Sequence, residues 1–300
     1  MDGVLVIDKP AGPTSHDVVA RARRALGETR IGHTGTLDPL ATGVLPLVIG
    51  KATRLASLLS STDKAYDAGI RLGASTDTYD AAGTVSAGGP AGDFTKIQAL
   101  QVEEVLSAFR GRIEQMPPPY SAKKVGGVPA YKLARKQKPT ALAAAPVTVH
   151  ELILVGMEAG LVRLRLVASA GFYVRSLAHD LGVRLGCGAH LETLRRTRAG
   201  RFGLDVAVAL EDLDRTPRLA EASLIPLGAL VPDIPAVRVN DRGATRVSHG
   251  NSLGPEDLAD AGPGRLPEGA RVRVVDGAGR LLAIADAGPD ALLRPSVVLV

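Results

Sequence analysis

The chain has 300 residues, of which 45% are hydrophobic and 22% charged, a composition typical of a globular protein and not of a disordered one. Its formal net charge is +5 at pH 7, which favours a negatively charged partner. The single cysteine, Cys187, excludes an intrachain disulfide. No apolar run approaches the roughly 20 residues of a membrane-spanning helix, and the N-terminal segment lacks the basic region and cleavage site of a signal peptide. We therefore expect a cytoplasmic protein with no membrane partner.

Two strands and a helix are predicted before residue 50. Residues 4–7 form a short apolar run with the pattern of a strand. Thr14 or Ser15 can cap a helix whose apolar residues recur on one face, and Gly27 can close it. A turn-rich loop over residues 31–43 follows, and residues 44–49 have the pattern of a buried strand interrupted by proline.

The middle of the chain alternates further strands and helices. The expected elements are a short helix over 51–60, a strand over 66–72, a helix over 102–109, a hairpin of 148–155 with 161–167 that turns at Ala159–Gly160, and an amphipathic helix over 172–185 that ends at Gly186. These elements do not follow a regular βαβ rhythm. The pattern therefore predicts an α+β fold with a mixed or antiparallel sheet and flanking helices.

The C-terminal part of the chain has a different pattern. Residues 217–235 look like a junction. Short strands separated by Gly and Pro follow at 237–239, 272–275, 281–285 and 297–300. We expect a main domain over residues 1–230 and a small β-rich domain over residues 231–300.

Positive charge is concentrated before residue 231. Residues 110–138 hold eight Lys or Arg against one acid, Glu114, whereas residues 231–300 hold eight basic and nine acidic side chains. Such clustering is typical of a nucleic-acid footprint. Within it, residues 116–146 are rich in Pro, Gly, Lys and Ala, with a short helical stretch near 130–135. We interpret them as a basic loop inserted into the main domain.

Asp38 is the most conspicuous candidate for chemistry. It lies in the turn-rich segment 31–43 with almost no other acid nearby, and Pro39 biases its backbone toward an extended conformation. A single carboxylate held in this way suits covalent or acid/base chemistry on a bound substrate. An Asx-turn, in which Asp38 bonds only to its own backbone, is the alternative.

Other catalytic motifs fit poorly. Residues 43–53 have the wrong spacing for a phosphate-binding loop, and Ala52 occupies its Ser/Thr position. Cys187 and His190 lack the second pair of ligands that a zinc site needs. The nine aromatic residues are too few for base-stacking platforms of the RRM type. The sequence therefore favours neither a kinase or GTPase nor a zinc site.

Residues 32–43, Gly-His-Thr-Gly-Thr-Leu-Asp-Pro-Leu-Ala-Thr-Gly, resemble the active-site signature of the TruB family of tRNA pseudouridine synthases. Further segments resemble other elements of that family, in the same order along the chain: Asp8–Ser15, Lys64–Tyr66 with Arg71–Gly73 and Thr76–Thr78, Pro118–Lys124, Gly171–Leu177 and Gly186–Leu191. Several such elements in register over about two hundred residues make the resemblance specific.

The resemblance implies a pseudouridine-synthase-like fold, with a PUA-like module over residues 231–300. It implies isomerisation of uridine to pseudouridine at position 55 in the T loop of tRNA, by base flipping and without a cofactor. The expected partner is the T arm of tRNA, which the basic loop would grip. The protein is expected to be a monomer with no obligate protein partner.

The resemblance also assigns roles to individual residues. Asp38 would be the catalytic carboxylate. Arg175 would keep it ionised and oriented, since arginine binds a carboxylate as a fork. Tyr66 would stack on the target base and is a candidate acceptor for its C5 proton. The remaining expected contacts to the base or to RNA are Tyr173, Leu194, His33, Lys9, Lys64, Lys123, Lys124 and Arg135.

Two other classes of function remain open at this level. One is a tRNA-binding chaperone that folds the T arm, because a basic surface supports that role equally well. The other is an enzyme acting on free nucleotides, although a small substrate does not need a long basic loop.

Overall fold

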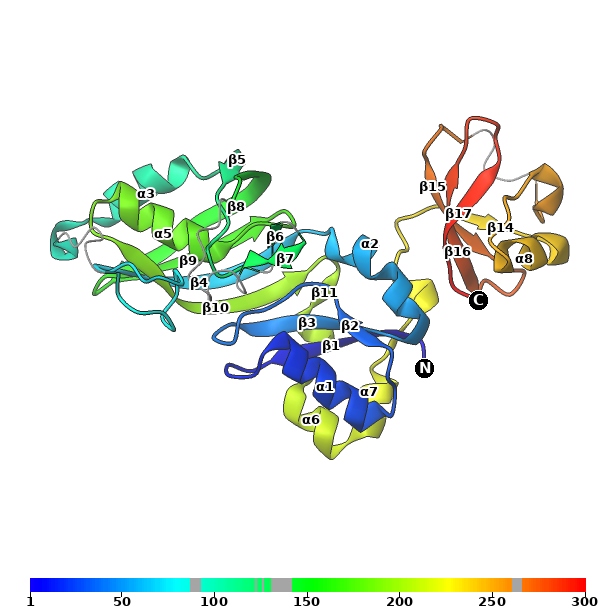
Figure 1. The fold of residues 1–300 in the computed structure, drawn as a ribbon, viewed down its shortest axis with the longest axis horizontal. Helices are drawn as coiled ribbons and strands as arrows, with labels where there is room; N and C mark the ends of the chain where they lie inside the picture. The colour runs from blue at the N-terminus through cyan, green and yellow to red at the C-terminus, as the bar shows by residue number, and fades with distance from the viewer. Residues whose placement is uncertain (87–92, 122, 126, 131–141, 261–265) are drawn as a thin grey trace.

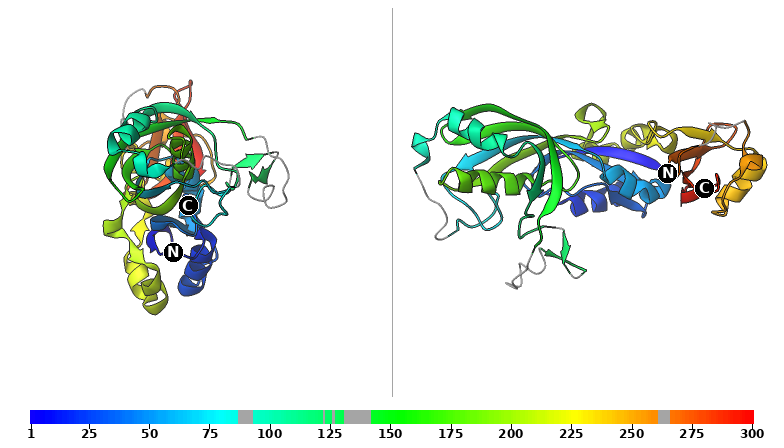
Figure 2. Two further views of the ribbon diagram at one scale, coloured as in Figure 1. Left: turned by 90° about the vertical axis from the view of Figure 1, so that its left-hand side faces the viewer. Right: turned by 90° about the horizontal axis from the view of Figure 1, so that it is seen from above.

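The computed structural model describes residues 1–300 except 87–92, 122, 126, 131–141 and 261–265. The described part contains an eleven-stranded sheet, a four-stranded sheet near the C-terminus and a two-stranded hairpin. The two larger sheets lie end to end along the long axis of the molecule, and the hairpin stands out from the side (Figures 1 and 2). No helix in these described ranges is long and apolar enough to cross a membrane.

The strands of the larger sheet come from the chain up to Pro226. They are β1 (Gly3–Lys9), β2 (Ile31–His33), β3 (Thr42–Ile49), β4 (Lys64–Leu72), β5 (Gly111–Gln115), β8 (Ala145–Glu158), β9 (Leu161–Ala168), β10 (Ala189–Ala199), β11 (Phe202–Gly203), β12 (Val208–Ala209) and β13 (Ile225–Pro226). Its main path runs β12-β1-β3-β10-β4-β9-β8-β5. β3 is antiparallel to β1 and parallel to β10. The expectation of an α+β fold with a mixed sheet is confirmed.

The helices are α1 (Ser15–Leu26), α2 (Ala56–Ser60), α3 (Ala99–Ser107), α5 (Val174–Arg184), α6 (Leu210–Arg215), α7 (Pro217–Ala222) and α8 (Asp241–Ser248). α1 begins and ends where the sequence predicts. The Thr14 side chain accepts a hydrogen bond from the backbone of Asp17, whose carboxylate accepts one from Thr14 in return, and Gly27 ends the helix with φ 61°.

One face of the larger sheet is covered by helices: α5 packs on β10 and β4, and α3 packs against α5 and β8 (Figure 1). Tyr66 and Leu166 pair across β4 and β9 and both belong to the apolar core on this face. The next residues along the strands, Asp67 and Arg165, point to the other face and are exposed. The period of two along each strand thus separates a buried face from a charged one.

The smaller sheet consists of β14 (Ala236–Arg238), β15 (Arg271–Val275), β16 (Leu281–Ala287) and β17 (Leu293–Val298). Its own apolar core includes Val272 and Leu293. A second cluster joins it to the larger sheet, because Leu281 and Ile284 belong to the same buried group as Val48.

Three details differ from the sequence-based expectations. Residues 217–235 are not a simple junction, because they include α7 and β13, and β13 pairs with the edge of β1. β3 runs without a break through Pro46, whose carbonyl still accepts a hydrogen bond from Thr34 N at 3.2 Å. The long strand β10 was not predicted. The helix expected at 130–135 lies almost entirely outside the described residues.

Candidate active site

The loop between β2 and β3 carries Asp38, and its backbone is fixed on both sides of that residue. Ser15 Oγ donates to Leu37 O at 3.0 Å and accepts from Leu37 N at 2.8 Å. On the other side, Gly12 N donates to Pro39 O at 2.8 Å. The start of α1 and the segment before it therefore hold the Asp38 loop in place.

Lys9, the last residue of β1, supports the same loop from inside the protein. Its side chain is fully buried, and Nζ donates to the carbonyl oxygens of Pro10 and Pro13 at 2.8 Å and of Pro39 at 3.3 Å. Burial lowers the pKa of Lys9 to about 8, although the charge of Asp38 opposes this. The sequence predicts that Lys9 contacts a phosphate of RNA. In the structure its ammonium group is enclosed and bound to backbone carbonyls, which ties it to the Asp38 loop.

Arg175, near the start of α5, binds the Asp38 carboxylate as a fork. Arg175 Nε lies 2.9 Å from Asp38 Oδ2, and Nη2 donates to Oδ1 at 3.1 Å. The Arg175 side chain is 7% exposed, whereas that of Asp38 is 31% exposed. The predicted contact is therefore present, and it leaves part of the carboxylate accessible. Because the carboxylate binds Arg175, this contact opposes the Asx-turn alternative.

The remaining edge of the Arg175 guanidinium is also occupied. It donates to Thr78 O at 3.2 Å and to Tyr120 O at 3.0 Å, and Nη1 lies 3.7 Å from Asp80 Oδ2. Asp80 is 5% exposed. Sequence reasoning missed Asp80, although it lies just after the Thr76–Thr78 element. Two carboxylates thus share one guanidinium, and this fixes its orientation.

The surroundings of Asp38 favour the protonated carboxyl more than water does. Burial raises the pKa of Asp38, the positive charges of Arg175 and Lys9 oppose the rise, and the negative charge of Asp80 adds to it. A carboxylate with a raised pKa is a stronger base and nucleophile than an ordinary one. This suits bond making or proton transfer at a substrate.

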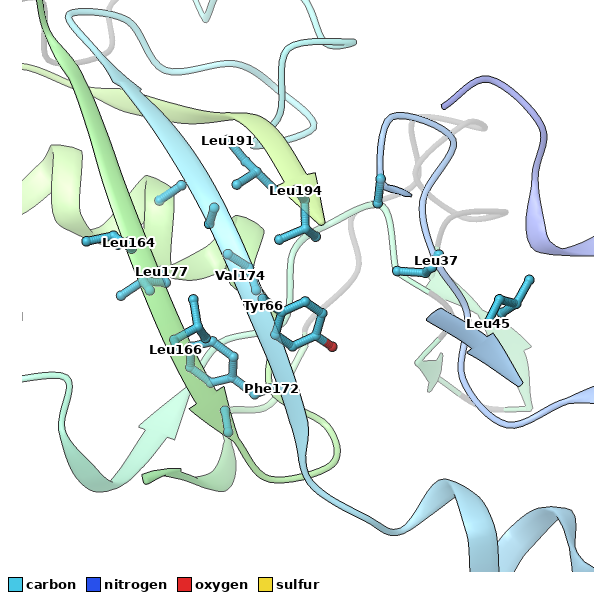
Figure 3. Close-up of a cluster of buried hydrophobic side chains, with 14 of the residues drawn as sticks. Leu37, Leu45, Tyr66, Leu164, Leu166, Phe172, Val174, Leu177, Leu191 and Leu194 are labelled. Atoms are coloured by element: carbon cyan, nitrogen blue, oxygen red, sulfur yellow. The ribbon is translucent and has the colours of Figure 1, made fainter. Parts of the chain in front are cut away.

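Tyr66 lies in β4 beside this carboxylate and is 9% exposed. Figure 3 shows its ring below Leu194, with the hydroxyl pointing to the side on which Leu37 and Leu45 lie and away from Leu166 and Phe172. Burial raises the pKa of Tyr66, and the charge of Arg196 opposes the rise. The phenol therefore forms the apolar floor of the site and turns its one polar atom toward the charged groups.

Arg196 on β10 is the second residue that sequence reasoning missed. Its side chain is 2% exposed, Nε donates to Val44 O at 2.7 Å, and Nη2 donates to Gly35 O at 3.0 Å. Within the described ranges no carboxylate lies within 4.0 Å of it. The only signal in the sequence was a run of arginines between residues 195 and 198.

Tyr173 and Leu194 complete the wall near Tyr66. Gln115 holds the backbone of Tyr173 through hydrogen bonds of 2.8 and 3.0 Å. Burial raises the pKa of Tyr173, and the negative charge of Asp38 adds to the rise. Leu194 is 8% exposed and packs beside Tyr66 (Figure 3). The structure thus brings both predicted base contacts to the Asp38 site.

His33 ends β2 at the beginning of the Asp38 loop. Its Nδ1 accepts a hydrogen bond from Gly35 N at 3.3 Å, which leaves Nε2 to carry the ring proton. Burial lowers the pKa of His33, and the nearby charges of His16 and Arg196 lower it further. The ring is edge-on to His16, with 5.9 Å between the centroids.

Among the other predicted RNA contacts, Lys64 is buried, whereas Lys123 and Lys124 lie at a projecting hairpin (Figure 2). Lys64 is 8% exposed, donates to the carbonyl oxygens of Ser60 and Thr62, and has a pKa that burial lowers to about 8. Its ammonium group, like that of Lys9, is bound to backbone carbonyls, and its contact with a phosphate stays a prediction.

Lys123 and Lys124 lie at the base of the hairpin formed by β6 (Lys124–Val125) and β7 (Val128–Pro129), which projects from the molecule (Figure 2). Lys123 Nζ donates to Ala143 O at 2.9 Å. Arg135 lies outside the described residues.

No group of three or more His, Cys, Asp or Glu in the described part of the chain is arranged to hold a metal ion. The site offers the carboxylates of Asp38 and Asp80, two guanidinium groups and the phenols of Tyr66 and Tyr173.

Comparison with solved structures defines the class of protein. The fold matches that in "Crystal Structure of a Cbf5-Nop10-Gar1 Complex" with a TM-score of 0.75 and 28% identity, over 99% of this chain and 85% of the other. It matches "Structure of H/ACA RNP bound to a substrate RNA containing 2'-deoxyuridine" with a TM-score of 0.73 and 27% identity, over the same shares. The architecture is that of a pseudouridine synthase.

Family models and relatives identify the family. The model of the TruB family pseudouridylate synthase N-terminal domain matches residues 23–174, and that of the tRNA pseudouridylate synthase B C-terminal domain matches residues 175–227. The tRNA pseudouridine synthase B of Solibacter usitatus is 45% identical over 305 residues, covering 100% of both chains, and that of Geobacter sulfurreducens is 43% identical over 95% of this chain and 93% of its own. This chain belongs to the TruB family and is a pseudouridine synthase, an enzyme of the isomerase class.

Proposed function

We propose that this enzyme converts uridine to pseudouridine at position 55 in the T loop of tRNA, with Asp38 as its catalytic carboxylate. The names of its relatives support tRNA as the substrate. The observation that carries the catalytic assignment is the partly exposed Asp38 carboxylate held by the buried Arg175 fork beside Tyr66. We further propose that the enzyme acts in the cytoplasm as a monomer and that residues 231–300 form a PUA-like module attached to a catalytic domain of residues 1–230.

The reaction rearranges one nucleotide. The bond between uracil N1 and ribose C1′ breaks, the uracil turns, C5 bonds to C1′, and the proton on C5 leaves while N1 gains one. The atoms therefore balance without a second substrate. A base stacked in a folded T loop must first leave its stack, which costs a few kcal/mol that stacking and phosphate contacts offset.

In this proposal Asp38 takes part directly in breaking the glycosidic bond. Attack at C1′, attack at C6 and removal of a sugar proton are the three routes open to it. Each needs an ionised carboxylate, and the Arg175 fork keeps Asp38 ionised and aimed. The raised pKa of Asp38 increases its strength as a base or nucleophile.

The buried aromatic and aliphatic groups receive the flipped uracil. Tyr66 stacks on the base, Tyr173 lines the pocket, and Leu194 contacts the base through its backbone. Tyr66 or Asp38 accepts the C5 proton. The Tyr66 hydroxyl is directed away from Leu166 and Phe172, and this supports Tyr66 as the acceptor of the C5 proton (Figure 3).

The T arm is held by His33 and by the basic loop of residues 116–146, including Lys123, Lys124 and Arg135. The Nε2–H of His33 is the donor left for RNA, since its Nδ1 is occupied by Gly35. The projection of the hairpin at Lys124 from the side of the molecule supports the gripping role of this loop (Figure 2).

The direct test is tritium release from unmodified tRNA labelled at C5 of uridine. Forming the bond between C5 and C1′ expels that hydrogen, so release reports the proposed chemistry. We expect the intact enzyme to release tritium, and Asp38→Asn to release none while binding tRNA within a few fold of normal. Asp67→Asn, on the exposed opposite face, is the matched control.

Three outcomes would contradict parts of this proposal. Release by Asp38→Asn would remove its catalytic role, and a joint loss of binding and release would make Asp38 structural. Release from a tRNA that lacks uridine 55 would overturn the proposed position of the modified uridine.

A secondary role in folding the T arm, supported by the basic loop, predicts that Asp38→Asn still accelerates tRNA folding.

A further inference from the structure

The loop of residues 76–80 holds the edge of the Arg175 guanidinium that faces away from Asp38. Arg175 Nη1 donates to Thr78 O at 3.2 Å and lies 3.7 Å from Asp80 Oδ2. Tyr79 lies between these two contacts in the chain. Its conformation therefore sets the spacing at which Thr78 and Asp80 reach the guanidinium.

Tyr79 has a backbone conformation that tyrosine rarely adopts. Its φ is 65°, in the left-handed region that favours glycine because a Cβ crowds the backbone there. Two backbone bonds hold it, from Tyr79 N to Thr76 O at 3.2 Å and from Leu191 N to Tyr79 O at 3.0 Å. Such a conformation persists in a non-glycine residue only where the surroundings enforce it, and strain of this kind concentrates at functional sites.

The side chain of Tyr79 provides a further restraint, because its ring lies flat on the imidazole of His179. The ring centroids are 3.8 Å apart and the planes differ by 7°. His179 follows Arg175 by four residues on α5, so both side chains project from the same side of that helix. The Nδ1 atom of His179 is buried without a hydrogen-bond partner among the described residues. The imidazole therefore contributes mainly through its stacking contact with the Tyr79 ring.

We infer that the Tyr79–His179 stack is a positioning device for the reaction, which fixes the 76–80 loop on α5 so that Thr78 and Asp80 orient Arg175 toward Asp38. The inference rests on the proposed function, because it gives Arg175 and Asp38 their catalytic roles. Tyr79 and His179 act through Arg175 and are positioning residues. Without the stack, the loop gains freedom, and the guanidinium no longer holds Asp38 in a single orientation.

Two substitutions remove the stack while treating the backbone differently. Tyr79→Gly removes the ring and at the same time suits the left-handed backbone, so it separates loss of the stack from backbone strain. His179→Leu removes the other ring from a helix position that leucine favours. Tyr79→Phe and His179→Phe keep two stacked rings and test rescue. Val183 lies on the same helix and is 48% exposed, so Val183→Ala is the control.

The measurements are the single-turnover rate of tritium release, the Kd for unmodified tRNA and the melting temperature. We expect Tyr79→Gly and His179→Leu to lower the single-turnover rate about tenfold to a hundredfold, the scale expected when a catalytic group is misplaced. The Kd should stay within about twofold. The melting temperature of Tyr79→Gly should fall little, because relief of the left-handed backbone offsets part of the lost ring contact. The two Phe variants should recover most of the rate.

Normal rates in both ring-removing variants would overturn the inference. So would a loss that Tyr79→Phe and His179→Phe fail to rescue, or one that follows the melting temperature across the whole set. Asp38→Asn measured in parallel separates this outcome from failure of the proposed function. An inactive Asp38→Asn beside a fully active Tyr79→Gly refutes only the positioning role, whereas an active Asp38→Asn refutes the catalytic assignment itself.

Discussion

Arg196 and Tyr66 lie directly opposite each other on neighbouring strands, β10 and β4, in the interior of the larger sheet. The guanidinium is tied to β3 through Val44 O and to the Asp38 loop through Gly35 O. Burial raises the pKa of Tyr66, and the positive charge of Arg196 opposes that rise. One buried cation thus connects the strand that carries the phenol with the loop that carries the carboxylate.

Arg196→Gln should therefore reduce both stability and activity. The buried Val44 O and the part-buried Gly35 O lose their donor, and a buried group left unpaired costs about 1–3 kcal/mol. The pKa of Tyr66 should rise further, which makes its phenolate harder to form. Urea unfolding and single-turnover tritium release measure the two effects. Arg198→Gln, a half-buried arginine on the same strand, is the control. An Arg196→Gln enzyme with normal rate would separate this cation from the chemistry.

Arg175→Lys should keep the positive charge and lose the fork. An ammonium group cannot make two parallel bonds to Asp38 while also bonding to Thr78 O. We expect the single-turnover rate to fall about tenfold to a hundredfold with little change in the Kd for tRNA. A rise in the Kd with an unchanged rate would instead place Arg175 in RNA binding.

Arg175→Gln should move the acidic limb of the pH–rate profile. The positive charge of Arg175 lowers the pKa of Asp38, so its removal lets that pKa rise further above the ordinary value. The ionised carboxylate is then lost at a higher pH, and the acidic limb shifts toward neutrality. Arg175→Lys keeps the charge and should shift it less. An unchanged limb in Arg175→Gln would mean that another group controls it.

Lys9→Met should change how stability depends on pH. The pKa of Lys9 is about 8 in the folded protein and 10.5 in the reference state, so folding releases a proton between these values. Stability contributed by this group therefore increases as pH rises from 8 to 10.5. The difference in free energy of unfolding between the intact protein and Lys9→Met should grow across this window. Lys96→Met, whose side chain is 83% exposed in the intact protein, is the control for loss of a lysine. A constant difference would contradict the lowered pKa.

Features that depend on neighbouring residues can be predicted from the sequence alone. The cap at Thr14 and the stop at Gly27 define α1 through hydrogen bonds within a few residues. The hairpin of β8 and β9 turns at Ala159–Gly160, which have φ of 46° and 74°. Local bonding and backbone sterics are fixed by adjacent residues, so they can be predicted without the fold.

In contrast, the burial of charged side chains and the groups that they face depend on the tertiary fold. Lys9 and Lys64 look like surface lysines in the sequence, yet both are enclosed and bound to backbone carbonyls. Arg196 appeared as one of several arginines, and it is the one that the pleat of β10 turns inward beside Tyr66. Asp80 reaches Arg175 across 95 residues of chain because the 76–80 loop folds onto α5. Burial and long-range electrostatics arise from contacts between segments that are distant in the chain, so no local pattern specifies them.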